Sequence, residues 1–317
     1  MSLEFAINVP SSAGVGGHKD HPFWPKATWD DIRNLAERAD AAGFDTIAFP
    51  DHFTIGEGTT FECFSTLSAL AMVTEDAMLY PKVVNSLFRN PGLLAKTGAT
   101  FDTISGGRLK MGLGAGWVGS EMTAYGYEWP DPVERIRRME ETAEILKRLW
   151  TGSTVDYDGE YYSLEEATCR PQPRQSPRPP IVIGGGGEKF TLRVVARHAD
   201  SWNWIGPFDG WEHKRDVLTD HCEEEGRDVE DIEKSWFGRV VVRETESEAR
   251  DLVERAEMFD SFESAREEHL VGTPAQVGAQ LNRLAEMGLD EIVVEFVDVP
   301  DQTGLRLFAD EVMPSFH

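Results

Sequence analysis

At 317 residues the chain is long enough for two ordinary domains or for one α/β barrel, and its 40% hydrophobic content can fill a large core. The net charge of −25, from 56 acidic and 31 basic residues, makes nucleic acid and anionic membranes poor partners. The sequence shows no membrane span, no secretory signal and only three isolated cysteines, so we expect a cytoplasmic protein.

The acidic residues are spread along the chain rather than held in a tail, and arginine outnumbers lysine by 22 to 9. We hypothesise that this acidic protein is halophilic, because a Debye length of about 3 Å at 1 M salt would screen its self-repulsion. An acidic enzyme adapted to ordinary salt is the alternative.

Eight strand-like runs can be counted, and most are separated by helical patterns. Caps mark several limits: Thr28 opens a capping box, Gly43 ends that helix, and Asn90 precedes a proline at a first helical position. We expect strands at 3–9, 45–49, 78–84, 109–113, 180–183, 201–205, 236–242 and 291–297. We expect helices at 28–43, 61–73, 90–103, 133–150, 188–198, 211–226, 274–287 and 303–312.

Two connections are longer than a repeating strand–helix unit requires. Residues 118–180 hold an aromatic loop, a long amphipathic helix, a hairpin at 155–162 and a proline-rich segment, whereas 243–271 is acidic and helical. Pro81 falls inside the third strand, where we expect a bulge because proline cannot donate to a ladder. The order predicts an α/β fold, a (β/α)8 TIM barrel with insertions after strands 4 and 7, as a single domain over 1–317.

Active sites of such barrels lie at the carboxyl ends of the strands, and this rule selects candidate residues. Asp51 and His52 follow the second strand, Asn85 follows the third, and Asn203 lies near the end of the sixth. A histidine with a pKa near its ordinary value of about 6.5 can accept or donate a proton at neutral pH. The structural alternative, an aspartate turn beside a hydrogen-bonded histidine, stays open.

Glycines follow the fourth and fifth strands. Residues 105–117 read as a turn, a buried strand and a glycine-alternating exit to Trp117, which is typical of a bound planar molecule or of a packed tryptophan. Four glycines at 184–187, between a strand and a helix, favour phosphate binding. Candidate cations for an anionic ligand are Arg89, Lys189 and Arg193, although each alone reads as solvated surface.

Other chemistries have weak support. The eight histidines show no metal-binding spacing beyond His18 and His21, so we expect no metal, and no nucleophile elbow occurs. Glu295 and Arg239 could pair inside the barrel, and we interpret this pair as structural.

The segments SGGRLKMGLGAGW, FPDHF, FRNPGLLAKTGATFD and IVIGGGGEKFTLRVVARHADSWN together resemble the bacterial luciferase-like monooxygenase superfamily. Within it, the chain is most similar to the branch that uses the deazaflavin coenzyme F-420. The resemblance implies a TIM barrel with the cofactor ring in its mouth and a non-proline cis peptide near Lys82 and Val83. Pro81 and Lys82 depart from the small residues common there.

The same match implies site residues. His52, Asp51 and Glu121 would be catalytic, with Asp51 and His52 touching ring and substrate. Cofactor-binding residues would be Asp51, Lys82, Val83, Asn85, Ala115, Gly116, Trp117, Gly184, Gly185, Gly186 and Gly187.

The preferred function is hydride transfer between coenzyme F-420 and a small organic substrate, with His52 handling the hydroxyl proton. One alternative is a two-component monooxygenase that uses reduced FMN and needs a flavin reductase as partner. The other is a luciferase-like barrel that binds cofactor without catalysis. The resemblance also implies a homodimer, and we expect no nucleic acid or membrane partner.

Overall fold

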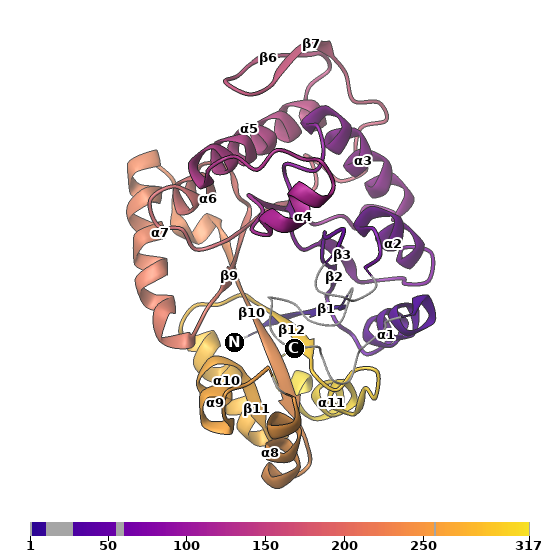
Figure 1. Ribbon diagram of the computed structural model, residues 1–317, viewed down its shortest axis with the longest axis vertical. Coiled ribbons are helices and arrows are strands. Elements are labelled where there is room, and N and C mark those ends of the chain that lie inside the picture. The colour runs from indigo at the N-terminus through magenta and orange to yellow at the C-terminus, as the bar shows by residue number, and fades with distance from the viewer. Residues whose placement is uncertain (1, 11–27, 55–59, 257, 317) are drawn as a thin grey trace.

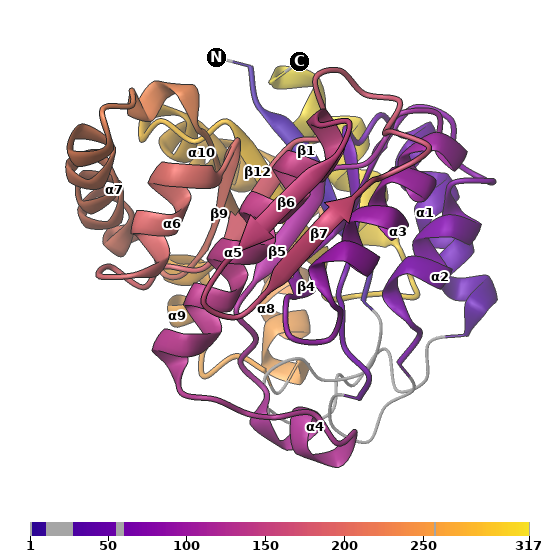
Figure 2. The same ribbon diagram turned by 90° about the horizontal axis from the view of Figure 1, so that it is seen from above.

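A computed structural model of the protein describes residues 2–10, 28–54, 60–256 and 258–316. The loops expected at 10–26 and 54–60 fall largely outside these residues, as do His18 and His21. Parallel strands form a ring, and helices surround it (Figure 1). The two termini lie at one end of the barrel and α4 at the other (Figure 2).

The ring follows the order β3-β2-β1-β12-β10-β9-β8-β5-β4. Leu79 of β3 bridges Leu109, just before β5, while β4 pairs with β5, so β3 and β4 are consecutive parts of one barrel strand and the ring closes. The strands are β1 (Glu4–Asn8), β2 (Thr46–Phe49), β3 (Met78–Pro81), β4 (Val84–Asn85), β5 (Met111–Gly114), β8 (Ile181–Gly184), β9 (Ser201–Ile205), β10 (Glu233–Val242), β11 (Leu270–Gly272) and β12 (Glu291–Phe296). The predicted (β/α)8 barrel is confirmed.

Helices lie between the barrel strands, and two begin at the predicted caps. The Thr28 side chain completes a capping box and Asn90 caps α3, as predicted, and Thr273 completes a capping box that was not predicted. The α-helices are α1 (Trp29–Ala41), α2 (Cys63–Leu70), α3 (Pro91–Ile104), α4 (Gly119–Ala124), α5 (Pro132–Thr151), α6 (Thr191–His198), α7 (Trp211–Glu225), α8 (Glu246–Arg255), α9 (Phe262–Glu268), α10 (Pro274–Glu286) and α11 (Thr303–Leu307). Short 3-10 turns lie at η1 (Phe208–Gly210), η2 (Val229–Asp231) and η4 (Met313–Ser315), and a π-helical turn at η3 (Phe308–Val312).

The third barrel strand is interrupted where Pro81 predicted a bulge. Pro81 is the last residue of β3, and the Lys82 N–H donates to the Phe49 carbonyl at 2.9 Å as the last bond of the β2–β3 pairing; Val84 then begins β4, which pairs with β5. The peptide between Lys82 and Val83 is cis, which confirms the position that the family resemblance implied.

Both long connections were predicted in outline, but details differ. The segment at 243–271 contains β11, which pairs with β10, so the expectation of helix throughout was wrong there. The hairpin consists of β6 (Val155–Asp158) and β7 (Ser163–Ala167), with its second strand further along the chain than expected. The Glu141 carboxylate accepts N–H groups from 160–162, so these residues form the turn.

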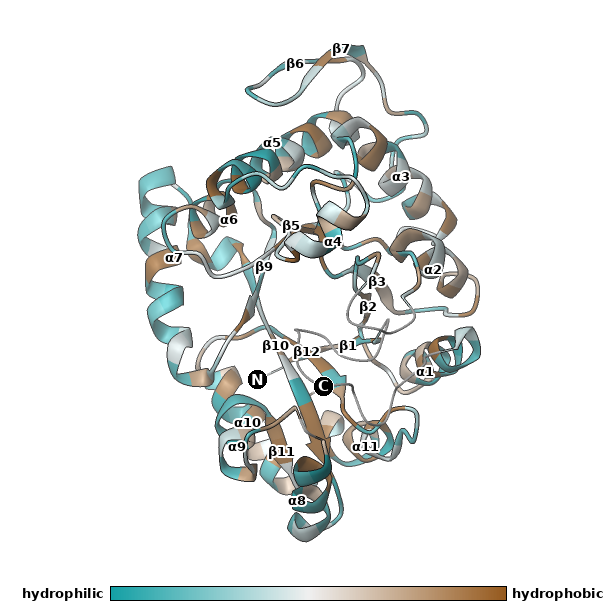
Figure 3. Ribbon diagram, viewed as in Figure 1, coloured by the Kyte–Doolittle hydropathy of each residue, from teal (hydrophilic) through white to brown (hydrophobic). Residues whose placement is uncertain are grey.

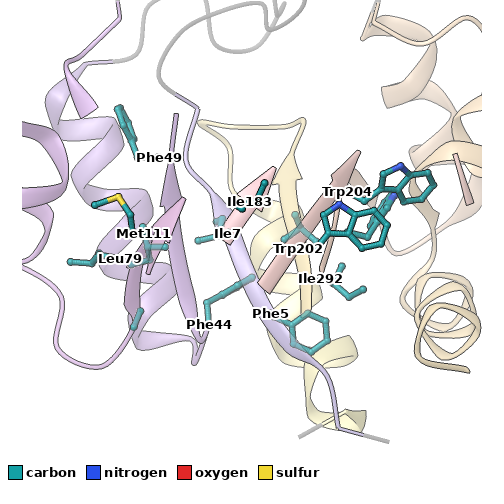
Figure 4. Close-up of a cluster of buried hydrophobic side chains, with 14 of the residues drawn as sticks. Phe5, Ile7, Phe44, Phe49, Leu79, Met111, Ile183, Trp202, Trp204 and Ile292 are labelled. Carbon is teal, nitrogen blue, oxygen red and sulfur yellow. The ribbon is translucent and has the colours of Figure 1, made fainter. Parts of the chain in front are cut away.

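The core has two parts. Large side chains point from the strands toward the helices, as Figure 4 shows for Phe5, Trp202 and Ile292. Inside the ring the contacts are made by a smaller set: Ala6, Ala48, Tyr80, Val182 and Val293, with Val83 and Phe237 packed against them. Among the surrounding helices α7 is largely hydrophilic, whereas α2 and α3 are more hydrophobic (Figure 3). Within the described part of the chain, no helix combines the length and apolarity needed to cross a membrane.

A buried lysine pairs with carboxylates at the amino ends of the strands. The Lys110 ammonium lies 2.7 Å from Glu233 and 3.0 Å from Glu291, and Glu4 is close by. Burial opposes the charge on Lys110, but the two carboxylates raise its pKa above the ordinary value. Lys110 is therefore the cation that pairs with these glutamates. They lie at the amino-terminal face of the barrel, the face that usually contributes stability.

Candidate functional site

A cavity of about 410 Å³ opens at the carboxyl ends of the strands, within the usual range for small-molecule sites. Seven of the eight barrel strands contribute lining residues directly. The remaining strand, β2, contributes through the segment that follows it. The lining residues are Asn8, Pro50, Asp51, His52, Lys82, Val83, Asn85, Gly114, Ala115, Gly116, Trp117, Val118, Glu121, Pro132, Arg135, Ile136, Gly184, Gly185, Thr191, Asn203, Ile205, Phe237 and Glu295.

The cavity brings together most of the residues selected from the sequence. Those lining it are Asp51, His52, Lys82, Val83, Asn85, Ala115, Gly116, Trp117, Glu121, Gly184 and Gly185. Gly186 and Gly187 do not line it: the Gly186 carbonyl accepts from Lys214 at 3.0 Å, and Gly187 packs on Thr191. The helix α6 begins at Thr191, three residues later than expected, so the glycines are separated from it by a turn.

His52 and Glu121 form a pair at the cavity wall. His52 Nδ1 lies 3.1 Å from Glu121 Oε2, and the other carboxylate oxygen accepts the N–H groups of Phe53 and, at 2.8 Å, Thr54. Burial would raise the pKa of Glu121, but the hydrogen bond from His52 and these N–H groups lower it. An ionised Glu121 accepts at Oε2, so His52 donates from Nδ1 and keeps Nε2 as the proton acceptor.

Asp51 is held by Arg89. The guanidinium makes two hydrogen bonds to the carboxylate, at 2.7 and 2.9 Å, and the Asn85 N–H donates a third at 3.0 Å. Arg89 also binds Glu62 at 2.8 Å. Burial works against the charged guanidinium, but its bond to Asp51 outweighs this and raises the pKa of Arg89. Arg89 thus anchors a wall residue instead of facing an anionic ligand.

Glycines make room for the Val83 side chain. A Cβ on Gly114 would lie 2.6 Å from Val83 Cγ2, and one on Gly184 would lie 3.1 Å from Cγ1. Gly116 has φ of +72°, which favours glycine, and a Cβ there would meet the Asn85 amide at 2.8 Å. The strand ends therefore present backbone to the cavity.

Aromatic and cationic groups surround the mouth. Trp117 is 58% exposed, and its ring meets that of His52 edge-on with centroids 5.8 Å apart. Arg135, at the start of α5, stacks on Trp129 at 3.7 Å and donates to the Gly116 carbonyl at 2.8 Å. Sequence reasoning missed Arg135, because only the fold brings α5 to the cavity.

Side chains from several strands also contact one another inside the ring. The Lys82 ammonium lies 3.5 Å from the Phe237 ring centroid, and Asn8 Nδ2 donates to Glu295 Oε2 at 2.6 Å. Arg239 Nε lies 3.8 Å from Glu295, as the expected pair requires. The sequence offered no signal for Asn8 or Phe237 as lining residues. The predicted cations Lys189 and Arg193 do not line the cavity, and Arg193 contacts Glu225 at 3.5 Å.

The closed barrel and the cavity at its carboxyl end define a (β/α)8 protein with a small-molecule pocket. Residues 3–269 match the family described as luciferase-like monooxygenase. The chain therefore belongs to the luciferase-like monooxygenase family, which confirms the resemblance seen in the sequence.

Relatives of known activity represent both expected cofactors. An "F420-dependent glucose-6-phosphate dehydrogenase" of Microbacterium testaceum is 26% identical, covering 90% of this chain and 93% of the relative. An "FMNH(2)-dependent dimethylsulfone monooxygenase" of Pseudomonas putida is also 26% identical, covering 98% and 94%. The structure of a coenzyme F420 dependent tetrahydromethanopterin reductase from Methanopyrus kandleri has a TM-score of 0.81 at 18% identity, covering 100% of both chains, and supports the fold alone.

Proposed function

We propose that this protein is an oxidoreductase that transfers hydride between coenzyme F-420 and a small organic substrate. The observation that carries the proposal is the His52–Glu121 pair in the wall of the barrel cavity. A histidine oriented by a buried carboxylate is suited to take a proton from a substrate hydroxyl, or to return one to a carbonyl.

The residues present fit a phosphate-bearing ring cofactor. Gly114, Ala115 and Gly116 line one wall of the cavity beside the closely packed Val83 side chain, and a planar group would lie against this wall. The cavity also reaches Thr191 at the start of α6, which has no side-chain cap, and the Arg135 guanidinium. An uncapped helix start and a guanidinium both favour an anion. When bound, the deazaflavin would accept or donate the hydride.

The protein's own residues would handle the proton and the orientation. Glu121 positions His52 so that Nε2 can hold the proton that leaves the substrate oxygen. Trp117, edge-on to His52, limits water at the mouth and offers an apolar surface to the substrate. Asp51 supports this wall through Arg89 and the Asn85 N–H.

The test is a fluorescence titration of the purified protein with coenzyme F-420 and FMN in parallel. Tight binding of the deazaflavin, followed by its spectroscopically observed reduction or reoxidation with an alcohol or carbonyl substrate, is the expected result. Binding of neither cofactor would contradict the proposal.

A second candidate is a two-component monooxygenase that receives reduced FMN from a flavin reductase. It is favoured by the Pseudomonas putida relative, which matches almost the whole chain at the same identity. Preference for FMN in the titration, with oxygen uptake when reduced FMN is supplied, would select this function. The expected homodimer stays a prediction that sedimentation equilibrium would check.

A further inference from the structure

Two cationic side chains line the cavity, Lys82 and Arg135, and neither forms an ion pair with a described carboxylate. The acidic lining residues differ, because Asp51, Glu121 and Glu295 each have a partner on the protein. In a chain of net charge −25, unpaired cations facing a cavity indicate an anionic ligand. Arg135 lies at the rim, where the proposed function already requires a cation for the cofactor phosphate.

Lys82 is left without such a role. Its side chain extends from the break between β3 and β4 to Phe237 on β10, across the ring of strands. The aromatic face stabilises the ammonium but accepts no conventional hydrogen bond, and no described residue accepts one from Lys82 Nζ. Asn8 Oδ1, also at the cavity wall, is buried without a partner. The site therefore has unused hydrogen-bonding capacity.

The charges around Lys82 do not cancel. Glu295 is the nearest acidic group in this part of the cavity, and it is engaged by Asn8 at 2.6 Å and contacted by Arg239 at 3.8 Å. Glu291, the other carboxylate that acts on Lys82, is paired with Lys110 at 3.0 Å, so Lys82, Arg239 and Glu295 together carry one net positive charge. A monoanion would balance this charge, whereas a phosphate dianion would exceed it and be repelled by Glu295.

We propose that Lys82 is a specificity-determining residue that binds the carboxylate of an organic acid substrate in this cavity. This inference rests on the proposed function and narrows it to substrates that carry a carboxylate as well as a hydroxyl or carbonyl carbon. The carboxylate binds the Lys82 ammonium, while the reacting oxygen faces His52, which lines the same cavity.

The test is isothermal titration calorimetry of the whole protein with butyrate, butyramide and butyl phosphate, with and without saturating coenzyme F-420. We expect butyrate to bind about tenfold or more tightly than butyramide, as one charge-assisted hydrogen bond allows, and butyl phosphate to bind no better than butyrate. Lys82→Met should abolish this preference, and Lys82→Arg should keep most of it.

The matched control is Lys147→Met. Lys147 lies on α5, away from the cavity lining, and burial also lowers its pKa to about 8. This variant should keep the butyrate preference. An unchanged preference in Lys82→Met, or tighter binding of butyl phosphate, would overturn the inference. The cofactor is titrated separately, so loss of coenzyme F-420 binding with an intact butyrate preference would count against the proposed function alone.

Discussion

Glu121 determines which nitrogen of His52 can accept a proton, and a single atom change would reverse this. In Glu121→Gln the amide would donate to Nδ1, so the histidine would carry its proton on Nε2. We expect kcat to fall by about 10² or more, with the dissociation constant of the cofactor nearly unchanged. Steady-state kinetics, a pH–rate profile and ¹⁵N NMR of the His52 ring would check the change of tautomer.

The control is a second His–Glu pair outside the cavity. His213 Nε2 lies 3.0 Å from Glu188 Oε1 on the exposed surface. Glu188→Gln should leave the pH–rate profile unchanged. His52→Ala should abolish turnover while retaining cofactor binding, and full activity in that variant would remove His52 from the mechanism.

Arg89 matters for stability because it neutralises a buried aspartate. In Arg89→Met, Asp51 would be left buried with only the Asn85 N–H, at a cost of about 3–5 kcal/mol. Urea denaturation would measure this loss. Arg137→Met, which removes an exposed contact of 3.5 Å to Glu160, should leave the denaturation midpoint nearly unchanged. Equal losses would mean that the buried pair has no special role.

Lys82 should lower the stability of the ligand-free protein. Burial lowers its pKa to about 8, with Glu295 and Glu291 on β12 opposing the shift and Arg239 on β10 adding to it. The unfolded chain keeps the Lys82 proton to higher pH than the folded protein does. The loss of folding free energy caused by the buried charge is therefore complete below pH 8 and becomes smaller as the pH rises above 8.

Lys82→Met should therefore melt about 2 °C or more above the wild type at pH 7, and this difference should shrink at pH 9. Thermal melts at both values would check it. A lower melting temperature for the variant at pH 7 would contradict this, because it would show that contacts within the protein already offset the cost of burying the Lys82 ammonium.

At the scale of elements, the ends of β5 and β8 are built around Val83. A Cβ on Gly114 would displace the Val83 side chain, so Gly114→Ala should weaken cofactor binding by about tenfold or more while the fold persists. Cofactor titration and circular dichroism would separate the two effects. Val83→Ala in the same chain should restore part of the affinity.

The control is another glycine in a regular element. A Cβ on Gly278, inside α10, would have nothing within 4 Å. Gly278→Ala should keep cofactor affinity and raise the free energy of unfolding by about 0.5–1 kcal/mol. A similar loss of cofactor binding in both variants would contradict a specific role for the β5 end.

At the scale of the whole molecule, the charge of −25 predicts a strong dependence on salt. We expect the melting temperature to rise between 0.1 and 2 M KCl, because the Debye length falls from about 10 Å to below 3 Å and screens repulsion between acidic groups. Differential scanning calorimetry over this range would measure it. A melting temperature that stays constant or falls with salt would contradict the halophilic hypothesis and favour an acidic protein adapted to ordinary salt.

Much of the barrel could be predicted because its signals are local. Alternating apolar runs, the caps at Thr28 and Asn90, and the strand–helix order each depend on residues close in sequence, and parallel strands then place their carboxyl ends on one face. This is why Asp51, His52 and Asn85 could be placed at one end of the barrel, whereas Glu121, 69 positions from His52, was selected only through the family resemblance. The short strand β11 was missed because the residues around it have a helical pattern, and its strand conformation depends on tertiary pairing with β10.

Only the tertiary structure decided how the charges in the cavity are partnered. From the sequence Arg89 was a candidate ligand-binding cation, Lys82 was a departure from the family pattern beside the cofactor, and Arg135 was not selected at all. The closed ring pairs Arg89 with Asp51, carries Lys82 across to Phe237, and brings Arg135 to the mouth. These contacts join strands and helices far apart in the chain, and residue type and spacing do not encode them.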